Sequence, residues 1–559
     1  MDWSKFSASF VLSALYSLIL QVEPVGSMTT PNSSQSGAKS DRPSYRNYLT
    51  GRAADWIGLC WLLFVGLTVF ILCLPFLHSI LRLGDEGYLL HGAERLLQGR
   101  RLYIDFFEFL PPGIFVIVKV WFALTGISMC SARLLAILTI TGIACFTYLA
   151  CYRASKHAPS SALVVIGWAI MSQGSWTQIN HNWFTTLFSM VAAWAALASI
   201  EKPLRWEWKP LIAGLATGAA AMIIPTRGVL AMLAAAISFV GSRCQRTRLI
   251  AYLLGSAIVP ICLLVYVIAQ GALAAAFDDV VLFTAKRYAS VAIVPFGYFT
   301  DDQNRPLKYL FPLVALLTLI TCARGWRTSF RDPLFRSCVA FGLAGFIGCF
   351  PRPDISHIAF ATPLVCPLLT YCTHRIVASW PPKYSYALTA LVISLGIPSA
   401  AAFSFVVHTA LYGELISTHR GRVIFFYNGT RELIARIAAG PSSDRYFFYP
   451  YMPILPFLTA REHVSKYDVF IPGYTTSSQY QEACISALRH ASWLVIDRNW
   501  TAANFLRYFP ALRDAEPPEK RRFELALQNG FEFVARDGTF ELRRRVTTVD
   551  EAVCASITE

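Results

Sequence analysis

The sequence is poor in charge and lacks the cysteine patterns of metal sites. Only 15% of its 559 residues are Asp, Glu, Lys or Arg, whereas 55% are hydrophobic and 14% aromatic. This composition excludes an ordinary soluble protein of this length and predicts a polytopic membrane protein. None of the 14 cysteines belongs to a CxxC or Cys/His pattern with zinc spacing. All except Cys484 and Cys554 lie in or beside apolar runs, where a thiol behaves as a small hydrophobe, so only these two are candidates for a structural disulfide.

The C-terminal part of the chain also lacks the positive excess of the remainder. The formal net charge is +15, yet from Tyr412 onward 18 Lys and Arg face 17 Asp and Glu, which leaves 31 against 17 upstream. The excess therefore lies between the apolar runs, where the bias of cytoplasmic loops toward Lys and Arg accounts for it. No nucleic-acid partner is predicted.

Eleven apolar segments are interpreted as transmembrane helices. They are 56–81, 131–152, 161–177, 183–200, 210–224, 226–241, 249–270, 308–323, 334–350, 357–377 and 384–411. Four basic residues precede the first segment and place the N-terminus in the cytoplasm, and the basic clusters at 153–156, 202–209, 243–248 and 324–336 fall on the same side. This register requires the short apolar segment 113–126, which carries Lys119, to lie at the surface without crossing.

Two segments flank the predicted membrane domain, 55–411. Residues 1–54 are expected to be a cytoplasmic or unprocessed segment that is partly disordered; the apolar run 6–20 is compatible with a cleaved signal, an extra anchor or a true start at Met28. Residues 412–559 alternate short β-rich runs with helical stretches, one of which ends at a C-cap Gly440. We expect them to form a small α/β domain on the external side.

The first external loop, 81–130, gathers the residues best suited to chemistry. Asp85, Glu86, Asp105 and Glu108 lie within it, and 85–98 has the pattern of an amphipathic surface helix whose exposed flank carries His91. Asp85 is near the first turn of that helix, where the helix dipole favours a carboxylate. The simpler interpretation of Asp85 is a helix N-cap.

The predicted topology brings further polar residues to the same external face. The cations are Lys119, Arg133, Arg227, Lys286, Arg287 and Arg352, and the other polar residues are Asn180, His181, Asn182, Asp354 and His357. Cations at the outer ends of spans run against the positive-inside trend, and a lipid phosphate would explain them. A carboxylate that takes a proton from a hydroxyl, together with cations that stabilise a departing phosphate, can move a group from a lipid phosphate to an alcohol.

Each secondary residue also has a simpler interpretation. Arg133 can reach the interface from the end of a span, and His91 is more naturally a surface residue than a base. Asp354 and His357 can hydrogen-bond to close a short turn between two spans. Lys286 and Arg287 can be ordinary loop charges.

The loop resembles a known family. The run DEGYLLHGAERLLQGRRLYIDFFEFLPPGIFVIVK at 85–119, followed by FALTG and SARLLAI, resembles the first external loop of GT-C glycosyltransferases, in the clan of protein O-mannosyltransferases and lipid A aminoarabinose transferases. The resemblance is specific over 81–153. This chain lacks the large external β-trefoil insert of the mannosyltransferases, and Leu110 stands where the clan has the Lys of a Lys-Pro step, so the resemblance does not extend to the acceptor or the sugar.

The resemblance implies a mainly α GT-C fold with about eleven transmembrane helices, juxtamembrane helices in the first loop, and an external C-terminal domain. It implies Asp85 as the catalytic base with Glu86 as its companion, and Lys119 and Arg133 at the donor phosphate or in the framework of the site. The expected activity is inverting transfer of a sugar from a polyprenyl-phosphate-linked donor, on the external face of the plasma (inner) membrane, to an unspecified protein, lipid or glycan acceptor.

A cofactor is left open. The acidic residues of the loop are oxygen ligands that suit Mg²⁺ or Mn²⁺, with Asp85 and Glu86 as the candidate ligands. Two other functions are also compatible with the sequence: a transporter or lipid flippase, whose charges would line a pathway, and a non-catalytic envelope assembly protein.

Overall fold

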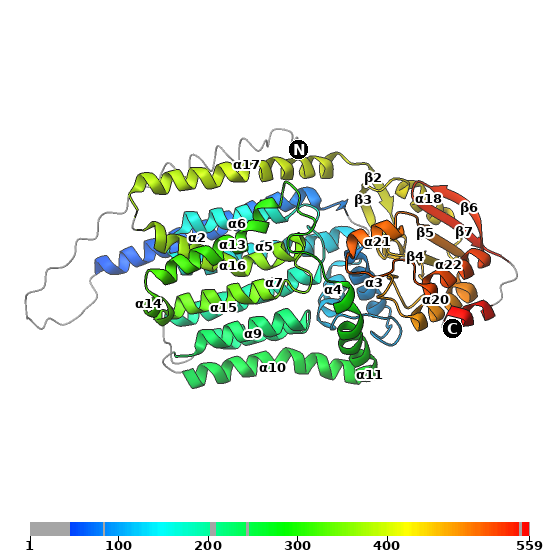
Figure 1. Ribbon diagram of the computed structural model, residues 1–559, viewed down its shortest axis with the longest axis horizontal. Coiled ribbons are helices and arrows are strands. Elements are labelled where there is room, and N and C mark those ends of the chain that lie inside the picture. Colours follow the sequence, from blue (N-terminus) through cyan, green and yellow to red (C-terminus); the bar gives the residue numbers. More distant parts are fainter. Residues whose placement is uncertain are drawn as a thin grey trace, which may run out of the picture.

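A computed structural model describes residues 45–81, 84–201, 208–241, 245–378, 380–546 and 551–557. The expectations for residues 1–44 and for the basic residues within 202–207 and 242–244 lie outside these ranges. The described chain forms a bundle of long helices with a smaller α/β part against one end (Figure 1).

Eleven helices of the bundle overlap the eleven expected spans, although the first span, expected over 56–81, ends at Cys73. They are α2 (Tyr45–Cys73), α5 (Met129–Ser155), α6 (Ala158–Ser172), α7 (His181–Glu201), α8 (Trp208–Ala221), α9 (Pro225–Phe239), α10 (Gln245–Ala269), α13 (Arg305–Ala323), α15 (Pro333–Ile347), α16 (Ile355–Val377) and α17 (Pro382–Tyr412). Within the described residues, seven helices are long and apolar enough to span a membrane: α2, α5, α7, α10, α13, α16 and α17. The protein is therefore a multi-pass membrane protein of mainly α class, as the sequence predicts.

Small residues let some of these helices approach closely. A Cβ added at Gly214 of α8 would lie 2.1 Å from the carbonyl oxygen of Tyr252 in α10, and one added at Gly255 of α10 would lie 2.3 Å from that of Leu211. Glycine is needed at both positions because the two backbones touch, which is the usual way in which membrane helices pack.

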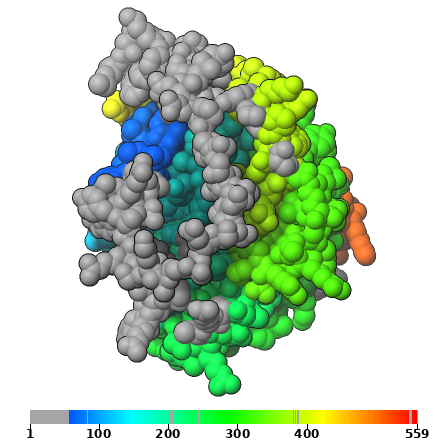
Figure 2. All heavy atoms as spheres, turned by 90° about the vertical axis from the view of Figure 1, so that its left-hand side faces the viewer, coloured from blue at the N-terminus to red at the C-terminus, as the bar shows by residue number. Residues whose placement is uncertain are grey.

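The end of the bundle away from the α/β part carries the described basic loops. It holds the turn between α5 and α6, the start of α10, and the short helix α14 (Trp326–Arg331) between α13 and α15. Figure 2 looks onto this end, where the start of α17 reaches the surface at the upper right in yellow-green. The described Lys and Arg of the predicted cytoplasmic loops thus lie together at one end.

The opposite end is covered by short elements. Besides α3 (Asp85–Leu97) and α4 (Gly113–Thr125), they are η2 (Leu74–Phe76), α11 (Leu273–Ala276), the π-helix η3 (Phe277–Tyr288) and α12 (Ala289–Val291). The N–H of Gly113 donates to the carbonyl of Met222 just after α8, at 3.0 Å, and the ring of Phe122 stacks on Phe457 of the α/β part. The first residue of α4 is therefore bonded to the bundle and Phe122 near its end packs on the α/β part, so α4 lies between the two.

The C-terminal part is built on two sheets. Its elements are β2 (Leu415–Thr418), β3 (Gly421–Phe425), α18 (Thr430–Ala439), β4 (Tyr446–Tyr449), α19 (Ile454–Thr459), α20 (Ser477–His490), β5 (Trp493–Asp497), α21 (Ala502–Tyr508), α22 (Pro518–Gly530), β6 (Phe531–Asp537), β7 (Phe540–Arg545) and η4 (Glu551–Ile557). The larger sheet has the order β4-β5-β7-β6, with β4 and β5 parallel. In the smaller sheet, β1 (Ser79–Ile80) pairs with β3, so the chain leaving α2 is joined directly to the C-terminal part.

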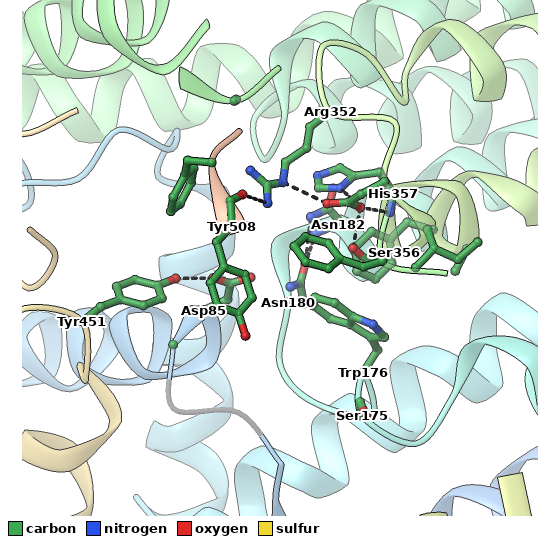
Figure 3. A pocket seen from close by; sticks show the side chains of 18 of the residues that line it. Asp85, Ser175, Trp176, Asn180, Asn182, Arg352, Ser356, His357, Tyr451 and Tyr508 are labelled. Atoms are coloured by element: carbon green, nitrogen blue, oxygen red, sulfur yellow. Dashed lines mark hydrogen bonds and ion pairs between the residues drawn. The ribbon is translucent and has the colours of Figure 1, made fainter. Parts of the chain in front are cut away.

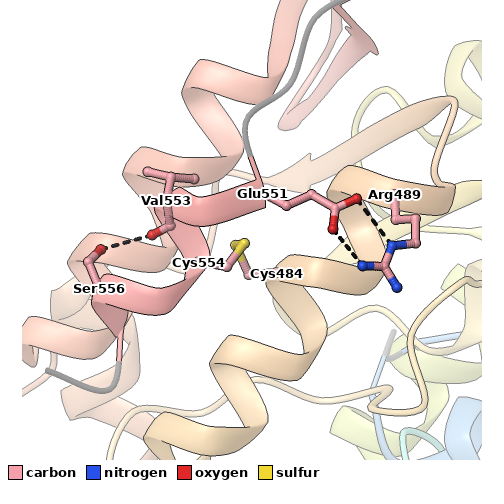
Figure 4. Close-up of a disulfide and its surroundings, with 6 residues drawn as sticks. All are labelled: Cys484, Arg489, Glu551, Val553, Cys554 and Ser556. Atoms are coloured by element: carbon pink, nitrogen blue, oxygen red, sulfur yellow. Dashed lines mark hydrogen bonds and ion pairs between the residues drawn. A yellow bond between two sulfur atoms is a disulfide. The ribbon is translucent and has the colours of Figure 1, made fainter.

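A disulfide closes the C-terminal part. Cys484 of α20 is bonded to Cys554 of η4, 70 residues later, within an apolar cluster under the larger sheet (Figure 4). These are the two cysteines that the sequence singles out. The bond ties the end of the chain to a core helix and constrains the unfolded chain.

Candidate active site

One large cavity lies between the covered end of the bundle and the C-terminal part. Its volume is about 590 Å³, and it is lined from the membrane side by α3, the α6–α7 loop, the segment before α13 and the α15–α16 turn. The C-terminal part supplies residues that follow β4 and β5. The expected residues that line this cavity are Asp85, Asn180, His181, Asn182, Arg352, Asp354 and His357.

Asp85 is the first residue of α3 and lines the cavity. Its Oδ1 accepts a hydrogen bond from the hydroxyl of Tyr451, a residue of the C-terminal part (Figure 3). The preceding Gly84 allows this contact, because a Cβ there would lie 2.4 Å from the Tyr451 ring. Burial, followed by the Asp85 charge, raises the pKa of Tyr451 well above its ordinary value, so this hydroxyl stays protonated as a donor.

Glu86 points away from the cavity into a buried ion pair. Its Oε1 accepts from Arg133 of α5 and from the N–H of Ile179 at 2.9 Å, while Arg133 also donates to the carbonyl of Ser79. Burial raises the pKa of Glu86, and the charge of Arg133 opposes that rise. The pair fixes α3, α5 and the α6–α7 loop relative to one another, and neither residue lines the cavity.

The opposite wall is the turn between α15 and α16. Arg352 donates from Nε to Asp354 at 2.9 Å and from Nη2 to the carbonyl of Tyr508 at 2.9 Å, while its Nη1 makes no hydrogen bond with any described residue (Figure 3). Asp354 also accepts from the backbone N–H of His357 at 3.0 Å and lies 2.7 Å from its Nδ1. Burial raises the pKa of Asp354, but His357 and Arg352 outweigh it and hold that pKa well below its usual range. Asp354 therefore caps α16, as the simpler interpretation has it, and also orients a cation toward the cavity.

The α6–α7 loop forms a third, uncharged wall. His181 Nδ1 lies 3.2 Å from the hydroxyl of Tyr88, and its Nε2 lies 3.1 Å from the amide nitrogen of Asn182. Asn180 is buried, and its Nδ2 has no partner among the described residues. The loop thus presents polar groups without net charge between Asp85 and Arg352.

Solved structures share this architecture. No protein-family model matches the sequence, and no curated protein matches it either. ArnT from Cupriavidus metallidurans bound to undecaprenyl phosphate is similar with a TM-score of 0.53 and 13% identity, covering 89% of this chain and 99% of that one. The chain has the GT-C fold. The apo form of the same ArnT gives the same score over 91% of this chain. The mycobacterial arabinofuranosyltransferase AftD has a TM-score of 0.50 and 13% identity, over 88% of this chain but only 40% of AftD.

Besides Glu86 and Arg133, four more of the expected residues lie outside the cavity lining. Lys119 is partly buried on α4, and Arg227 at the start of α9 donates from Nε to the carbonyl of Gly348 at 2.8 Å beside a much smaller void. Glu108 is buried, and its pKa is raised well above the ordinary value by that burial and then by Asp468. His91 is the fourth.

The expectation for His91 is wrong. Instead of facing solvent, it is buried, with Nδ1 3.2 Å from Asp468 of the C-terminal part. Arg95, one turn later, donates to the same carboxylate at 2.8 Å, and Glu94 accepts from Arg420. The polar flank of α3 is covered by the C-terminal part, because that part brings complementary charges to it.

The two candidate metal ligands do not converge. Glu86 is engaged with Arg133, while Asp85 faces the cavity and Tyr451. In the described ranges, no group of three or more His, Cys, Asp or Glu side chains is arranged to hold a metal ion. The residues present therefore do not fit the Mg²⁺ or Mn²⁺ site at Asp85 and Glu86 that the sequence leaves open.

The cavity residues of the C-terminal part are not among those that the sequence predicts at the site. Tyr451 follows β4 and Asp497 ends β5, the two parallel strands of the larger sheet. Ligands commonly bind beyond the carboxyl ends of parallel strands. The polar residues directly after the β-rich run 492–497, which ends at Asp497, are therefore a usable signal of the site.

Proposed function

We propose that the protein is an integral-membrane glycosyltransferase that moves a sugar from a polyprenyl-phosphate-linked donor to an acceptor hydroxyl. The observation that carries this proposal is the placing of Asp85 and Arg352 on facing walls of one cavity at the end of a GT-C bundle. ArnT, which shares the fold, was solved with undecaprenyl phosphate bound. A transporter would place its site near the middle of the membrane, whereas this cavity lies at one end of the helix bundle.

Asp85 suits the role of general base. Its carboxylate faces the cavity at the positive end of the α3 dipole, and the Tyr451 hydroxyl fixes its orientation. In the proposed step the acceptor oxygen bonds to the anomeric carbon while the bond from that carbon to the phosphate oxygen breaks. The acceptor proton passes to Asp85, the phosphate keeps the bonding electron pair, and the single displacement inverts the anomeric centre.

Arg352 suits the stabilisation of the leaving phosphate. Asp354 and the Tyr508 carbonyl hold its guanidinium by Nε and Nη2, so Nη1 is the nitrogen left for an anionic ligand. A positioned guanidinium stabilises the charge that develops on the phosphate as the bond to the sugar breaks. Glu86 and Arg133 support this geometry from behind as parts of the framework.

We further propose that the cavity faces the outside of the plasma (inner) membrane and that the N-terminus is cytoplasmic. Two independent features support this orientation. The described basic loops lie at the other end of the bundle, in agreement with the positive-inside rule. The Cys484–Cys554 disulfide lies on the cavity side, and disulfides persist in oxidising compartments.

The proposal is tested with purified protein in lipid nanodiscs, radiolabelled polyprenyl-phosphate sugars and an envelope extract as the acceptor source. Asp85→Asn should lower transfer by about 10³-fold or more, because the group that takes the proton is lost. Asp105→Asn is the matched control, since Asp105 lies in the same loop, pairs with Arg101 and is outside the cavity lining. Transfer at the wild-type rate by a folded Asp85→Asn protein would remove Asp85 from the mechanism.

A further inference from the structure

One wall of the cavity comes entirely from the C-terminal part, and its side chains have no role in the step described above. It consists of Asp497 at the end of β5, Asn499 and Trp500 in the following loop, and Tyr508 at the end of α21. We call these four residues the acceptor wall. They combine two aromatic rings with a carboxylate and an amide.

The acceptor wall has unused hydrogen-bonding capacity. Asp497 is only 3% exposed, and its Oδ1 accepts from the backbone N–H of Asn499 at 3.0 Å. Its Oδ2 has no hydrogen bond with any described residue. Asp497 is one of the residues that line the cavity. A carboxylate oxygen accepts more than one hydrogen bond, so Asp497 can bind hydroxyl groups of a ligand.

The aromatic members lie beside this carboxylate. The Tyr508 ring is 37% exposed and lines the cavity, with its centroid 5.4 Å from that of Trp500. Aromatic rings supply a large apolar contact surface at small entropic cost. A sugar ring carries hydroxyl groups at its edge and C–H groups on its faces, so a carboxylate next to exposed rings matches both parts of it.

The acceptor wall also touches the residues that carry the chemistry. The Trp500 ring meets the Tyr451 ring edge-on at 5.2 Å between centroids, and the Tyr451 hydroxyl donates to Asp85. The carbonyl of Tyr508 accepts from Arg352. Figure 3 shows Tyr508 inside the cavity together with Asp85 and Arg352. A ligand on this wall is therefore adjacent to the base that must reach its hydroxyl.

The wall is fixed to the membrane part. Besides the bond from Arg352 to Tyr508, the hydroxyl of Tyr298 donates to the carbonyl of Arg507 at 3.1 Å, and the Arg352 guanidinium lies over the Phe509 ring. Three consecutive residues at the end of α21 thus contact segments of the membrane domain. The aromatic rings are held in place before a ligand arrives, which reduces the entropic cost of binding.

We propose that the acceptor wall is the binding site for a carbohydrate acceptor, which it holds with one hydroxyl directed at Asp85. The proposal deepens the proposed function and rests on it for the identity of the reacting groups. The sugar stacks on Tyr508 and Trp500, and Asp497 and Asn499 bind its hydroxyls. The C-terminal part therefore selects the acceptor, while the membrane part holds the donor phosphate.

Binding can be tested without any donor. The full-length protein in lipid nanodiscs free of sugar detergents is titrated with a panel of soluble methyl glycosides of hexoses, pentoses and N-acetylhexosamines, followed by saturation-transfer NMR. At least one glycoside should receive saturation on its ring protons. Tyr508→Ala and Trp500→Ala should each weaken that binding by about 10-fold, and Asp497→Asn by about 10-fold or more. Trp326→Ala is the matched control, because Trp326 is exposed at the opposite end of the bundle and should leave binding unchanged.

Kinetics provide a second readout for the same variants. With an acceptor extract, Asp497→Asn and Tyr508→Ala should raise the acceptor KM much more than the donor KM, whereas Arg352→Met should act on the donor KM. Tyr508→Phe keeps the ring and is the matched control for the alanine variant, and Asp497→Asn tests the wall if the alanine variant does not fold. The glycoside binding of Tyr508→Phe should stay close to the wild type if stacking is the main contact of Tyr508.

The outcomes separate the two proposals. Absence of glycoside binding by the wild type, binding that none of the three wall variants weakens, or binding of Ser/Thr peptides in place of glycosides would each overturn the carbohydrate site. Glycoside binding by a wild type that fails to use any polyprenyl-phosphate sugar would instead overturn the transferase proposal and leave the carbohydrate site in place. Transfer from the donor without glycoside binding would overturn the carbohydrate site and leave the transferase proposal in place.

Discussion

Burial raises the pKa of Asp497 to about 6, from an ordinary value near 3.8, and the N–H of Asn499 opposes that rise. The sign of the effect on stability follows from this shift. Well below pH 4 the carboxyl group is protonated in both the folded and the unfolded chain, so its burial has little electrostatic cost. As the pH rises through about 6, the unfolded chain has already released the proton, and the folded state loses stability. A carboxylate kept at such a cost in a cavity is typical of a functional residue.

Replacing Asp497 by Asn should therefore stabilise the protein at neutral pH. The gain should reach up to about 3 kcal/mol near pH 8 and vanish near pH 4, because a pKa difference of about two units corresponds to that energy. Thermal unfolding in nanodiscs at both pH values measures it. Asp514→Asn, at an exposed site on the same part of the protein, is the control. Equal unfolding temperatures of Asp497→Asn and the wild type at pH 8 would contradict the prediction.

Variants of the Glu86–Arg133 pair can distinguish two roles for Arg133, a structural role in the framework and a contact with the donor phosphate. Arg133→Met should lower the free energy of unfolding by about 3–5 kcal/mol, because Glu86 is left buried without its partner. Adding Glu86→Gln, which keeps an acceptor for the Ile179 N–H, should restore more than half of that loss. Apparent unfolding temperatures of the two variants measure this. A stable Arg133→Met protein with a raised donor KM would instead place Arg133 at the phosphate.

Residue by residue, the sequence predicts the part of the site that is local. Asp85 is recognisable because it follows an apolar span and begins an amphipathic helix. Arg352, Asp354 and His357 are recognisable because charges at the outer end of a span are unusual. Tyr451 and Tyr508 carry no such signal, because an aromatic residue in a mixed α/β region is most simply explained as part of a core. Their contacts with Asp85 and Arg352 depend on the docking of one part on another.

At the scale of elements, α3 is the connection between the two parts of the molecule. Its apolar flank packs on α4, and its polar flank pairs with Arg420 and Asp468 of the C-terminal part. The pattern of hydrophobic residues distinguishes the two flanks but does not tell solvent from a charged partner more than 300 residues away. This is why the helix was expected on an open surface.

The close approach of α3 to α19 makes Gly87 a sensitive position. A Cβ at Gly87 would lie 2.1 Å from the backbone nitrogen of Ile454, so Gly87→Ala must push α19 and the neighbouring Tyr451 away. We expect transfer to fall at least about 10-fold with Asp85 unchanged, because a displacement of about 1 Å disturbs the reacting geometry. Hydrogen exchange of α3 and α19 should increase.

Gly396→Ala provides the comparison for this variant. Gly396 lies in α17 with no atom within 4 Å of an added Cβ, so the substitution should leave transfer unchanged. It should stabilise its helix by up to about 1 kcal/mol. Wild-type exchange and transfer in Gly87→Ala would show that the fit of α19 against α3 does not position the base.

At the scale of the whole molecule, composition and charge alone predict most of the architecture. Runs of apolar residues locate the helices of the bundle. Basic loops are expected at the cytoplasmic end only, so their alternation along the chain predicts the direction of each helix. The arrangement of the sheets is beyond such reasoning. The pairing of β1 with β3 joins segments that are more than 300 residues apart, and no local pattern in the two-residue strand β1 announces it.

The orientation of the molecule leads to the last prediction. Cys130, at the start of α5 on the cavity side, is a free and exposed cysteine. In intact cells it should react with a membrane-impermeant maleimide, and Cys130→Ser should lose the label. In that Cys130→Ser background, Arg327→Cys, at an exposed position of α14 on the opposite end, should react only after permeabilisation. The Cys484–Cys554 disulfide should resist alkylation on both sides until it is reduced. Labelling of position 327 from outside would invert the topology, and it would place the cavity in a reducing compartment where that disulfide does not persist.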